Sequence, residues 1–456
     1  MTMSDQFVSS EELLAQCQEA KNRALESGAD EAEVIAAWGT SQAVEFEKND
    51  LQLAISDDET VYGVRIIKDK RLGFASTNDH ASLSATIADA FSLAAASLPD
   101  ELHGLPEAHE ATAIEGLYHE DAAAVGVGDV TGLGAQLLNR VRDLDGRVSI
   151  DSGSVGAGQG ARAIASSKGV AAHTRGSQVS CYLFGMAVDG DEVGSFAVAG
   201  NGSRGFAGFK EKIDLCADQF VEKTLGALHP GKGSSYLGDV LFSPEATSSL
   251  IVGNLLGMLN TSAIRKGKSP MAGKVDEVIA ASALTLIDDP TVPGELDSSV
   301  FDREGQPRRK QVIIDQGRLL ALPYNHYEAV AAKIKGGSTG HAAGGAENLP
   351  GVSFGRVQMS PGEDKLADLL NTAKPTIIVT RFSGSTNGVT GEFSGVVKAG
   401  FLVERGEKRP ITEVLIAGNL LELYQNINAV SQETERIYGR VAYPWVRASG
   451  VSVTAG

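Results

Sequence analysis

The sequence predicts an α+β protein, with α/β layers of helix, meander and helix at the N-terminus and a β-rich, barrel- or sandwich-like domain at the C-terminus. Stretches of helical spacing enclose stretches that alternate with a period of two, and their order is not that of a β-α-β series. Glycine supplies 53 of the 456 residues, well above the usual ~7%, which indicates many turns and bent strands. A chain of this length predicts several domains of ~100–200 residues each.

The first unit, residues 1–98, is predicted to begin and end with a helix. Leu13, Cys17, Ala20 and Ala24 recur at helical spacing within residues 10–28. The closing helix is predicted at 81–98, where alanine is frequent. Period-two alternation predicts five strands between the two helices, at 34–38, 42–48, 51–56, 61–67 and 72–76.

A polar segment at 99–120, interrupted by Pro99 and Pro106, is predicted to be a linker. A central α+β domain follows at 121–231 and ends at the helix-breaking stretch 228–233. Its predicted helices and strands lie, in order, at 129–144, 147–155, 161–166, 171–175, 178–188 and 209–228.

The C-terminal domain, residues 232–456, is predicted to be rich in strands, with one long helix at 244–259 that begins at Pro244. The apolar side of this helix is interpreted as core or as partner interface. Hairpins are predicted at 311–322 and 400–416, around turns at 315–317 and 405–407. Many strands over ~200 residues favour a barrel or a sandwich.

Composition excludes several classes of function. The formal net charge is −18, from 58 acidic and 40 basic residues, which argues against binding of nucleic acid. No basic, apolar leader opens the sequence and no apolar run approaches the ~20 residues of a membrane span, so neither export nor membrane insertion is expected. Three scattered cysteines, Cys17, Cys181 and Cys216, predict a cytoplasmic protein without disulfides.

No motif by itself predicts catalysis. The stretch 156–160 (GAGQG) lacks the following helix that a dinucleotide site requires, and is interpreted as a turn. None of the eight histidines lies four or five residues from another, so no helix carries a zinc-binding pair. The hydroxyl-rich stretch 383–387 is read as a turn, and His341 as part of a flexible loop.

Several segments together nevertheless resemble the TldD/PmbA family, whose members are called modulators of DNA gyrase and are classed with the metallopeptidases. The resemblance covers nearly the whole chain, and its specificity comes from the order and spacing of the segments. They lie at 62–67, 71–79, 265–269, 390–394 and 416–420.

The resemblance implies two kinds of subunit. The TldD kind is a zinc peptidase with an H-E-x-x-x-H motif before the R-K-G loop and a late cysteine that completes the metal site. The PmbA kind, also called TldE, lacks both. Counting back from Arg265, the motif falls on residues 252–257. Val252 and Gly257 stand in place of the two histidines, and Gly253 stands in place of the glutamate. No cysteine follows residue 419. The chain therefore resembles a PmbA/TldE-type subunit.

This resemblance implies a non-catalytic, cytosolic subunit that pairs with a TldD-type peptidase and helps to process unfolded or small peptides. No cofactor is expected in this chain, and zinc is expected only in the partner. Strand pairing with an extended peptide is expected, and the candidate peptide-channel residues are His326, His341, Ser385 and Asn387. The alternatives are a stand-alone hydrolase with an unrecognised nucleophile in 383–387, and a homodimeric peptide-binding protein with no enzyme partner.

Overall fold

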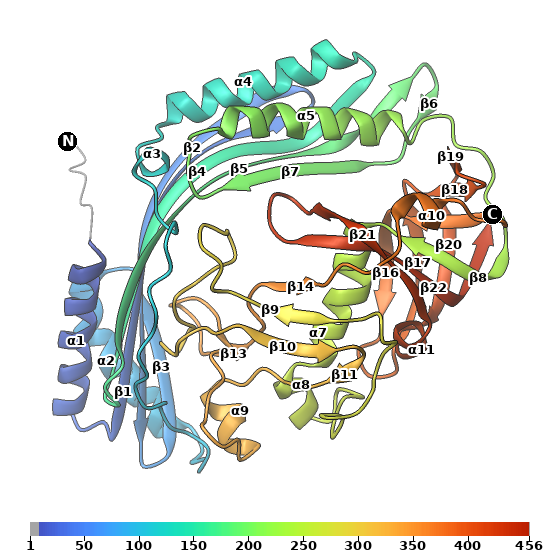
Figure 1. Cartoon of the computed structure of the whole chain (residues 1–456). Helices are drawn as coiled ribbons and strands as arrows, with labels where there is room; N and C mark the ends of the chain where they lie inside the picture. Colours follow the sequence, from blue (N-terminus) through green and yellow to red (C-terminus); the bar gives the residue numbers. More distant parts are fainter. Residues whose placement is uncertain (1–8, 456) are drawn as a thin grey trace.

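A long, strongly bent antiparallel sheet forms one side of the molecule (Figure 1). The computed structural model describes residues 9–455. The strands run in the order β3-β2-β1-β4-β5, with β6 and β7 both paired to β5. They are β1 (Glu31–Glu47), β2 (Asp50–Lys68), β3 (Arg71–Thr77), β4 (Val148–Ser166), β5 (Ala171–Asp189), β6 (Glu192–Val193) and β7 (Ala197–Ser203). The two predicted N-terminal units therefore share one sheet, because β1 pairs with β4 along 33–47.

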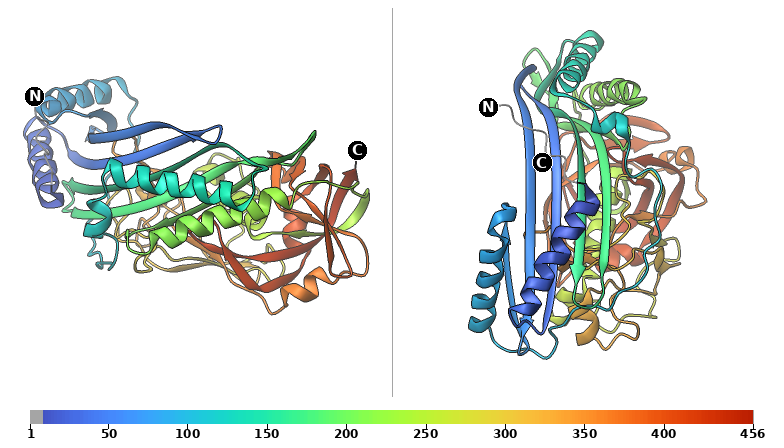
Figure 2. Two further views of the ribbon diagram at one scale, coloured as in Figure 1. Left: turned by 90° about the horizontal axis from the view of Figure 1, so that it is seen from above. Right: turned by 90° about the vertical axis from the view of Figure 1, so that its left-hand side faces the viewer.

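Helices cover the convex face of this sheet at its two ends (Figure 2). Helices α1 (Ser10–Glu26) and α2 (Leu83–Ala96) lie at one end, and α4 (Val127–Leu144) and α5 (Phe209–Leu225) at the other. The short elements η1 (His80–Ser82) and α3 (Glu120–Ala123) precede α2 and α4. Ser9 caps α1 by accepting a hydrogen bond from the Glu12 N–H at 3.1 Å. All four long helices fall within two residues of their predicted starts and within three of their predicted ends.

A row of glycines crosses the middle of the long sheet. Gly39 of β1 lies opposite Gly160 of β4, which lies opposite Gly176 of β5. A Cβ at Gly160 would sit 2.8 Å from the carbonyl oxygen of Trp38, so this close approach requires glycine. The turn predicted at 156–160 is wrong: this stretch lies in the middle of β4.

The C-terminal half builds a second sheet that curls into a half-barrel, which confirms the predicted α+β class with a β-rich C-terminal half. Its main path is β16-β17-β20-β22-β8-β15-β18-β19, with β21 paired to β22. The strands are β8 (Tyr236–Phe242), β15 (Thr376–Val379), β16 (Arg381–Thr386), β17 (Glu392–Lys398), β18 (Phe401–Glu404), β19 (Glu407–Pro410), β20 (Val414–Asn419), β21 (Ile427–Arg436) and β22 (Ala442–Ala455).

Two small sheets lie between the half-barrel and the concave face of the long sheet (Figure 1). The strands β9 (Leu286–Asp288), β10 (Gln311–Asp315), β11 (Arg318–Leu319) and β14 (Val357–Met359) form one small sheet, and β12 (Ala342–Ala343) and β13 (Gly351–Val352) form another. The short helices are α8 (Thr261–Arg265), α9 (His326–Ala331), α10 (Leu366–Leu370) and α11 (Leu420–Gln425). Among them, α10 and α11 pack against the half-barrel.

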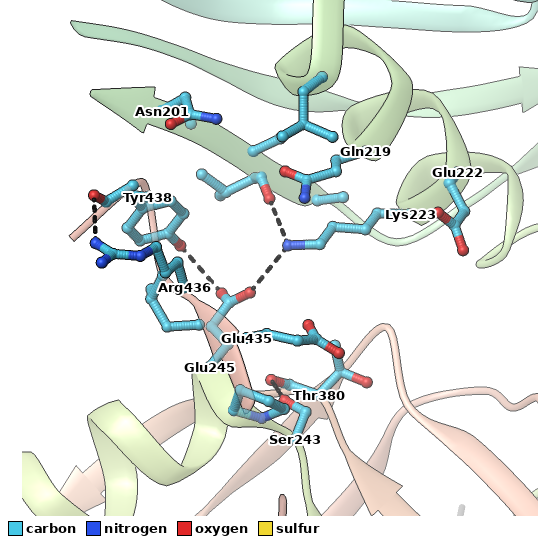
Figure 3. A pocket seen from close by; sticks show the side chains of 18 of the residues that line it. Asn201, Gln219, Glu222, Lys223, Ser243, Glu245, Thr380, Glu435, Arg436 and Tyr438 are labelled. Carbon is cyan, nitrogen blue, oxygen red and sulfur yellow. Dashed lines mark hydrogen bonds and ion pairs between the residues drawn. The ribbon is translucent and has the colours of Figure 1, made fainter. Parts of the chain in front are cut away.

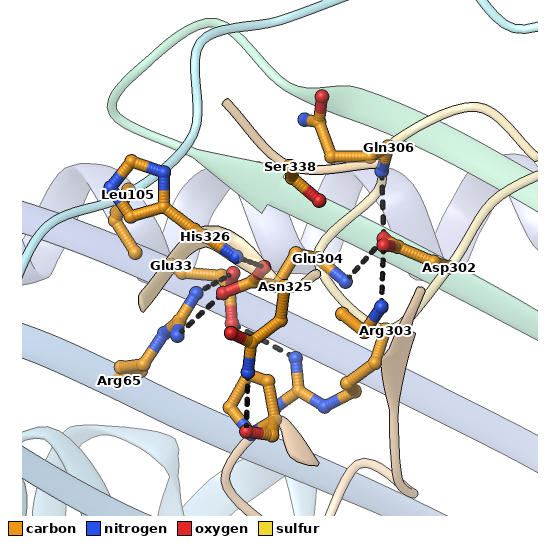
Figure 4. A network of polar contacts seen from close by, with 12 residues as sticks. Glu33, Arg65, Leu105, Asp302, Arg303, Glu304, Gln306, Asn325, His326 and Ser338 are labelled. Carbon is orange, nitrogen blue, oxygen red and sulfur yellow. Dashed lines mark hydrogen bonds and ion pairs between the residues drawn. The ribbon is translucent and has the colours of Figure 1, made fainter. Parts of the chain in front are cut away.

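A buried network of charges joins the two halves (Figure 4). Glu33 of β1 accepts hydrogen bonds from Arg65 of β2 at 2.6 Å and from Arg303 of the C-terminal half at 2.9 Å. Arg65 also donates to Glu304 at 3.1 Å. Burial raises the pKa of the Glu33 carboxyl, but the positive charges of Arg65 and Arg303 outweigh this effect and lower it overall. The network therefore fixes the C-terminal half against the long sheet.

Candidate functional site

The predicted motif position, residues 252–257, lies on a helix of unusual form. The predicted single helix 244–259 is α6 (Pro244–Ala246), a π-helical turn η2 (Thr247–Gly253) and α7 (Asn254–Met258). A π-turn has i→i+5 hydrogen bonds and is frequently found at functional sites. The turn ends at Gly253, so the helix is distorted at the start of the motif position.

The three residues of the motif position point in different directions. Val252 is 1% exposed and belongs to the core of the C-terminal half. Gly253 and Gly257 are exposed and line a groove of about 440 Å³, here called the helix groove. A Cβ at Gly257 would meet no atom within 4 Å, and one at Gly253 only the Ser248 carbonyl oxygen at 3.3 Å. The groove therefore has room where side chains are missing.

The residues around the helix groove do not fit a zinc ion. Its nearby polar groups are already engaged: Asn260 donates to the Val352 carbonyl oxygen at 2.8 Å, and Asp297 is ion-paired with Arg440. Zinc needs three or four His, Cys or carboxylate ligands. Within residues 9–455 no three such side chains are grouped in a way that could hold a metal ion. No step of a metal-dependent reaction can be assigned to this groove.

A larger cavity, of about 880 Å³, opens at the start of the same helix (Figure 3). This interdomain cavity lies between β7 and α5 on one side and the C-terminal half on the other. Glu245, the residue after Pro244, occupies its centre: the Tyr438 hydroxyl lies 3.2 Å from one carboxylate oxygen, and the Lys223 ammonium 3.6 Å from the other. Lys223 also donates to the Val198 carbonyl oxygen at 3.2 Å. Three distant segments therefore meet at Glu245.

Desolvation shapes the charges that line the interdomain cavity. Burial, with help from Arg436, lowers the pKa of Lys212, whose ammonium donates to the Gly202 carbonyl oxygen at 2.8 Å. Burial also lowers the pKa of Lys408, which lies over the Phe401 ring. Sequence reasoning missed this cavity because its charged residues come from separate parts of the chain. Ser243-Pro244-Glu245 at a helix start was the only local signal.

The two predicted channel histidines lie between the half-barrel and the long sheet. His326 begins α9, and its backbone N–H donates to Glu304 at 2.8 Å; burial lowers the pKa of its imidazole. His341 is 2% exposed, with Asp288 and the Thr339 hydroxyl 3.0 and 2.8 Å from its two ring nitrogens. His341 is therefore a buried, paired residue and not part of a flexible loop. Neither histidine lines the interdomain cavity or the helix groove.

The other two predicted channel residues lie on the outer strand of the half-barrel. Ser385 is exposed on β16, and Asn387 follows that strand and accepts from the backbone N–H groups of Val389 and Thr390 at 2.9 and 3.1 Å. Most of the stretch 383–387 is strand rather than the predicted turn. No hydrogen bond among residues 9–455 links it to a histidine, as a serine nucleophile requires. The structure does not bring the four predicted channel residues together, and their role stays a prediction.

Sequence comparison matches three consecutive parts of the chain, the first two of which share the long sheet. Models of the PmbA/TldA metallopeptidase family match residues 32–96 as domain 1, 120–228 as the central domain and 235–455 as the C-terminal domain. The chain belongs to the PmbA/TldD family. No helix among the described residues is long and apolar enough to cross a membrane.

Members of the PmbA/TldD family with curated names align over most of the chain. Metalloprotease PmbA of Escherichia coli O157:H7 is 26% identical over 442 residues, which is 92% of each protein. The PmbA homolog of Haemophilus influenzae is 25% identical and covers 89% of this chain. The crystal structure of TldE from Thermococcus kodakarensis has a TM-score of 0.87 and 24% identity, and covers 96% of this chain and all of its own. At that identity the structural likeness establishes the family's fold.

Proposed function

We propose that this chain is the non-catalytic, PmbA/TldE-type subunit of a cytoplasmic TldD/TldE-type zinc metallopeptidase complex that processes unfolded or small peptides. The observation that carries the proposal is the motif position: the π-distorted helix is present, but Val252, Gly253 and Gly257 offer no ligand to a metal. Zinc then belongs to the TldD-type partner alone. The three cysteines, all unpaired, are consistent with a reducing compartment.

In this proposal the subunit completes the chamber in which the partner works and holds part of the peptide in extended form. Backbone pairing holds a peptide of any sequence, because every residue but proline offers the same donor and acceptor. His326, His341, Ser385 and Asn387 remain the proposed channel contacts, with His341 acting through its neighbours because it is buried.

Mixing the purified chain with a TldD-type chain from the same organism tests the proposal. We expect no cleavage of an unfolded peptide by this chain alone, and chelator-sensitive cleavage by the mixture that exceeds the activity of the TldD-type chain by at least tenfold. The two chains should also co-elute in size-exclusion chromatography. Chelator-insensitive turnover by the lone chain would instead support a stand-alone hydrolase.

A further inference from the structure

The edge of the long sheet at β5 is bridged by a segment whose backbone, among residues 9–455, hydrogen-bonds to the sheet only near its two ends. This segment, residues 107–118, is here called the strap; it runs beside the sheet in Figure 1 between α2 and α3. At one end the Ala108 N–H donates to the Lys168 carbonyl oxygen at 3.2 Å. At the other end the Ser177 N–H donates to the Leu117 carbonyl oxygen at 3.0 Å. Residues 169–176 lie between these contacts. Side chains add contacts at the same ends: Glu107 is ion-paired with Lys168, and the Arg175 guanidinium lies 3.8 Å from the centre of the Tyr118 ring.

The backbone of β5 between the two contacts is an unpaired strand edge. The Ser177 N–H points away from β4, toward the strap, and in an antiparallel pair every second residue directs both backbone groups to the same side. Arg175, His173 and Ala171 therefore point their N–H and C=O groups outward. Strand β7 pairs with β5 only at 179–185, and within residues 9–455 no hydrogen bond reaches these outward groups.

A cavity of about 760 Å³, here called the edge slot, lies between this strand edge and the strap. Its floor is apolar, with Val170, Val300 and Phe301. Ala172, whose side chain faces the other way from His173 along the strand, packs with the same cluster. The strap contributes His109 to the opposite wall.

The C-terminal half holds the strap away from the strand edge. His109 Nδ1 lies 2.9 Å from the Gln306 side-chain oxygen, and the Gly294 N–H donates to the Glu115 carbonyl oxygen at 3.0 Å. Both contacts lie between the two ends of the strap and tie it to the C-terminal half rather than to β5. Between its ends, therefore, the strap does not pair with the strand beside it. An exposed strand edge can pair with other chains and cause aggregation, so proteins normally cover it. Here the strap covers the edge but leaves space for one more strand between them.

We propose that the edge slot binds an extended peptide, which adds a strand to the sheet beside Ala171–Arg175. The proposal rests on the proposed peptide-processing function and assigns the peptide a place on this chain. Ala171, His173 and Arg175 each present one backbone N–H and one C=O group to the slot, at every second position of the strand. The backbone of another extended chain matches this spacing. The floor near Phe301 selects apolar side chains at alternate positions of the guest, while the positions between them face away from it.

Substitution of His173 by proline tests this assignment without breaking the sheet. The His173→Pro change removes one outward N–H, and proline is tolerated in a strand when its missing N–H faces away from the ladder. His173→Ala is the matched control, because it removes the side chain, with its contact to the Ser10 hydroxyl at 3.0 Å, but keeps the backbone donor. The melting temperature of each variant shows whether it folds.

The probe is a fluorescein-labelled octapeptide of alternating valine and threonine with blocked ends, and a second copy carries N-methyl groups on alternate residues. We expect the wild-type chain to bind the first peptide, and His173→Pro to bind it at least tenfold more weakly. His173→Ala should stay within threefold of the wild type. The N-methylated peptide should bind at least tenfold more weakly, because it lacks the donors that face the strand.

Hydrogen–deuterium exchange of the wild-type chain gives a second measurement that needs no variant. Bound peptide should slow amide exchange at Ala171, His173 and Arg175 and leave Gly39 unchanged. Equal binding by folded wild-type and His173→Pro chains overturns the edge slot, as does self-association that His173→Pro abolishes without any peptide binding. The cleavage assay with a TldD-type chain is scored separately, so a failure of the edge slot is distinguishable from a failure of the proposed function.

Discussion

At the scale of single residues, the motif position divides into one buried residue and two open ones. Val252 packs in the core, whereas Gly253 and Gly257 face the helix groove and have space beside them. Loss of ligands at the two glycines therefore leaves the fold undisturbed, and the same positions accept side chains again. Restoring a histidine at Val252 is a different matter, because an imidazole there needs a hydrogen-bond partner that the core does not provide.

The first prediction compares Val252→His/Gly253→Glu/Gly257→His with the double variant Gly253→Glu/Gly257→His. The double variant should unfold within about 1 kcal/mol of the wild type, because Gly257 has open space beside it, and the gain from replacing glycine in a helix offsets the tight 3.3 Å approach of a Gly253 Cβ to the Ser248 carbonyl oxygen. The triple variant should lose a further 2 kcal/mol or so from the buried histidine. Denaturant unfolding measures both values.

Neither variant should cleave peptide, and zinc binding by the triple variant should be weak. The late cysteine is absent, and loss of the groups that orient metal ligands typically costs ~10–100-fold in affinity or activity. Zinc titration and a chelator-controlled cleavage assay provide the check. Rapid cleavage by the triple variant would mean that the rest of the active-site scaffold is intact.

The second prediction concerns Glu33, which is 1% exposed and ion-paired to Arg65 and Arg303. Glu33→Gln leaves two buried cations without their shared anion and should lower the free energy of unfolding by about 3–5 kcal/mol at pH 7. Glu45→Gln on the same strand is the control, since Glu45 is exposed and should change it by no more than about 0.5 kcal/mol.

The pH dependence of stability follows from the same network. The pKa of Glu33 is lowered in the folded chain, so its stabilisation is complete above the unfolded carboxyl pKa of ~4.3 and is lost as the pH falls through the folded value. The Glu33→Gln chain lacks this contribution, so its stability should fall less steeply in acid than that of the wild type. Denaturant unfolding at pH 7 and at several acid pH values measures the two slopes, and parallel slopes would contradict the assignment.

At the scale of elements, the helix α6–η2–α7 proves to belong to the core. Leu250, Ile251, Leu255, Met258 and Leu259 are all buried in the cluster of the C-terminal half. Of the two readings of its apolar side, core or partner interface, the structure supports core. The helix therefore contributes to the core of the C-terminal half even though it lacks the motif residues.

The third prediction tests that role. Leu255→Ala should cost about 2–5 kcal/mol, because Leu255 is 0% exposed and its removal leaves a cavity. The same change at the adjacent, half-buried Leu256 should cost less. Thermal and denaturant unfolding of the two variants are to be compared, and an unchanged midpoint for Leu255→Ala would assign this side of the helix to an interface.

The four long helices and the two C-terminal hairpins were predictable from local patterns, but the short helices and the full length of the long strands were not. The sequence divides β4 into two strands with a turn between them, because the stretch 156–160 is rich in glycine. In the structure those glycines let neighbouring strands approach closely, as Gly160 does against Trp38. A glycine inside a bent strand and a glycine in a turn look alike until the neighbouring strand is known.

The candidate sites were predictable only where one short segment carries them. The motif position was found by counting along the chain, and the structure places it where the π-helical turn η2 meets α7. The interdomain cavity and the edge slot combine residues from distant segments, such as Lys223 with Tyr438 and His173 with Phe301. No pattern in the sequence links such residues, so these sites emerge only from the fold.

At the scale of the whole molecule, the fourth prediction is that the purified chain carries far less than one zinc ion per molecule. The helix groove offers no ligands to a metal, and the described histidines are dispersed. Metal analysis after growth in zinc-supplemented medium and dialysis is the measurement. A complex with a TldD-type chain, prepared in the same way, should retain zinc. One dialysis-resistant zinc per lone chain would contradict the prediction.

The pairing of β1 with β4 also sets the order in which the chain can fold as it is synthesised. β1 ends at Glu47 and β4 begins at Val148, so about 100 residues are synthesised before the free edge of β1 can pair with β4. At usual rates this takes roughly 5–20 s of translation. During that time the hairpin exposes an unpaired edge, which is a risk for aggregation. The polar stretch Gly39-Thr40-Ser41-Gln42 in the middle of β1 lowers that risk. A stretch that carries Gly39, one of the glycines in the row across the finished sheet, thus also protects the nascent chain.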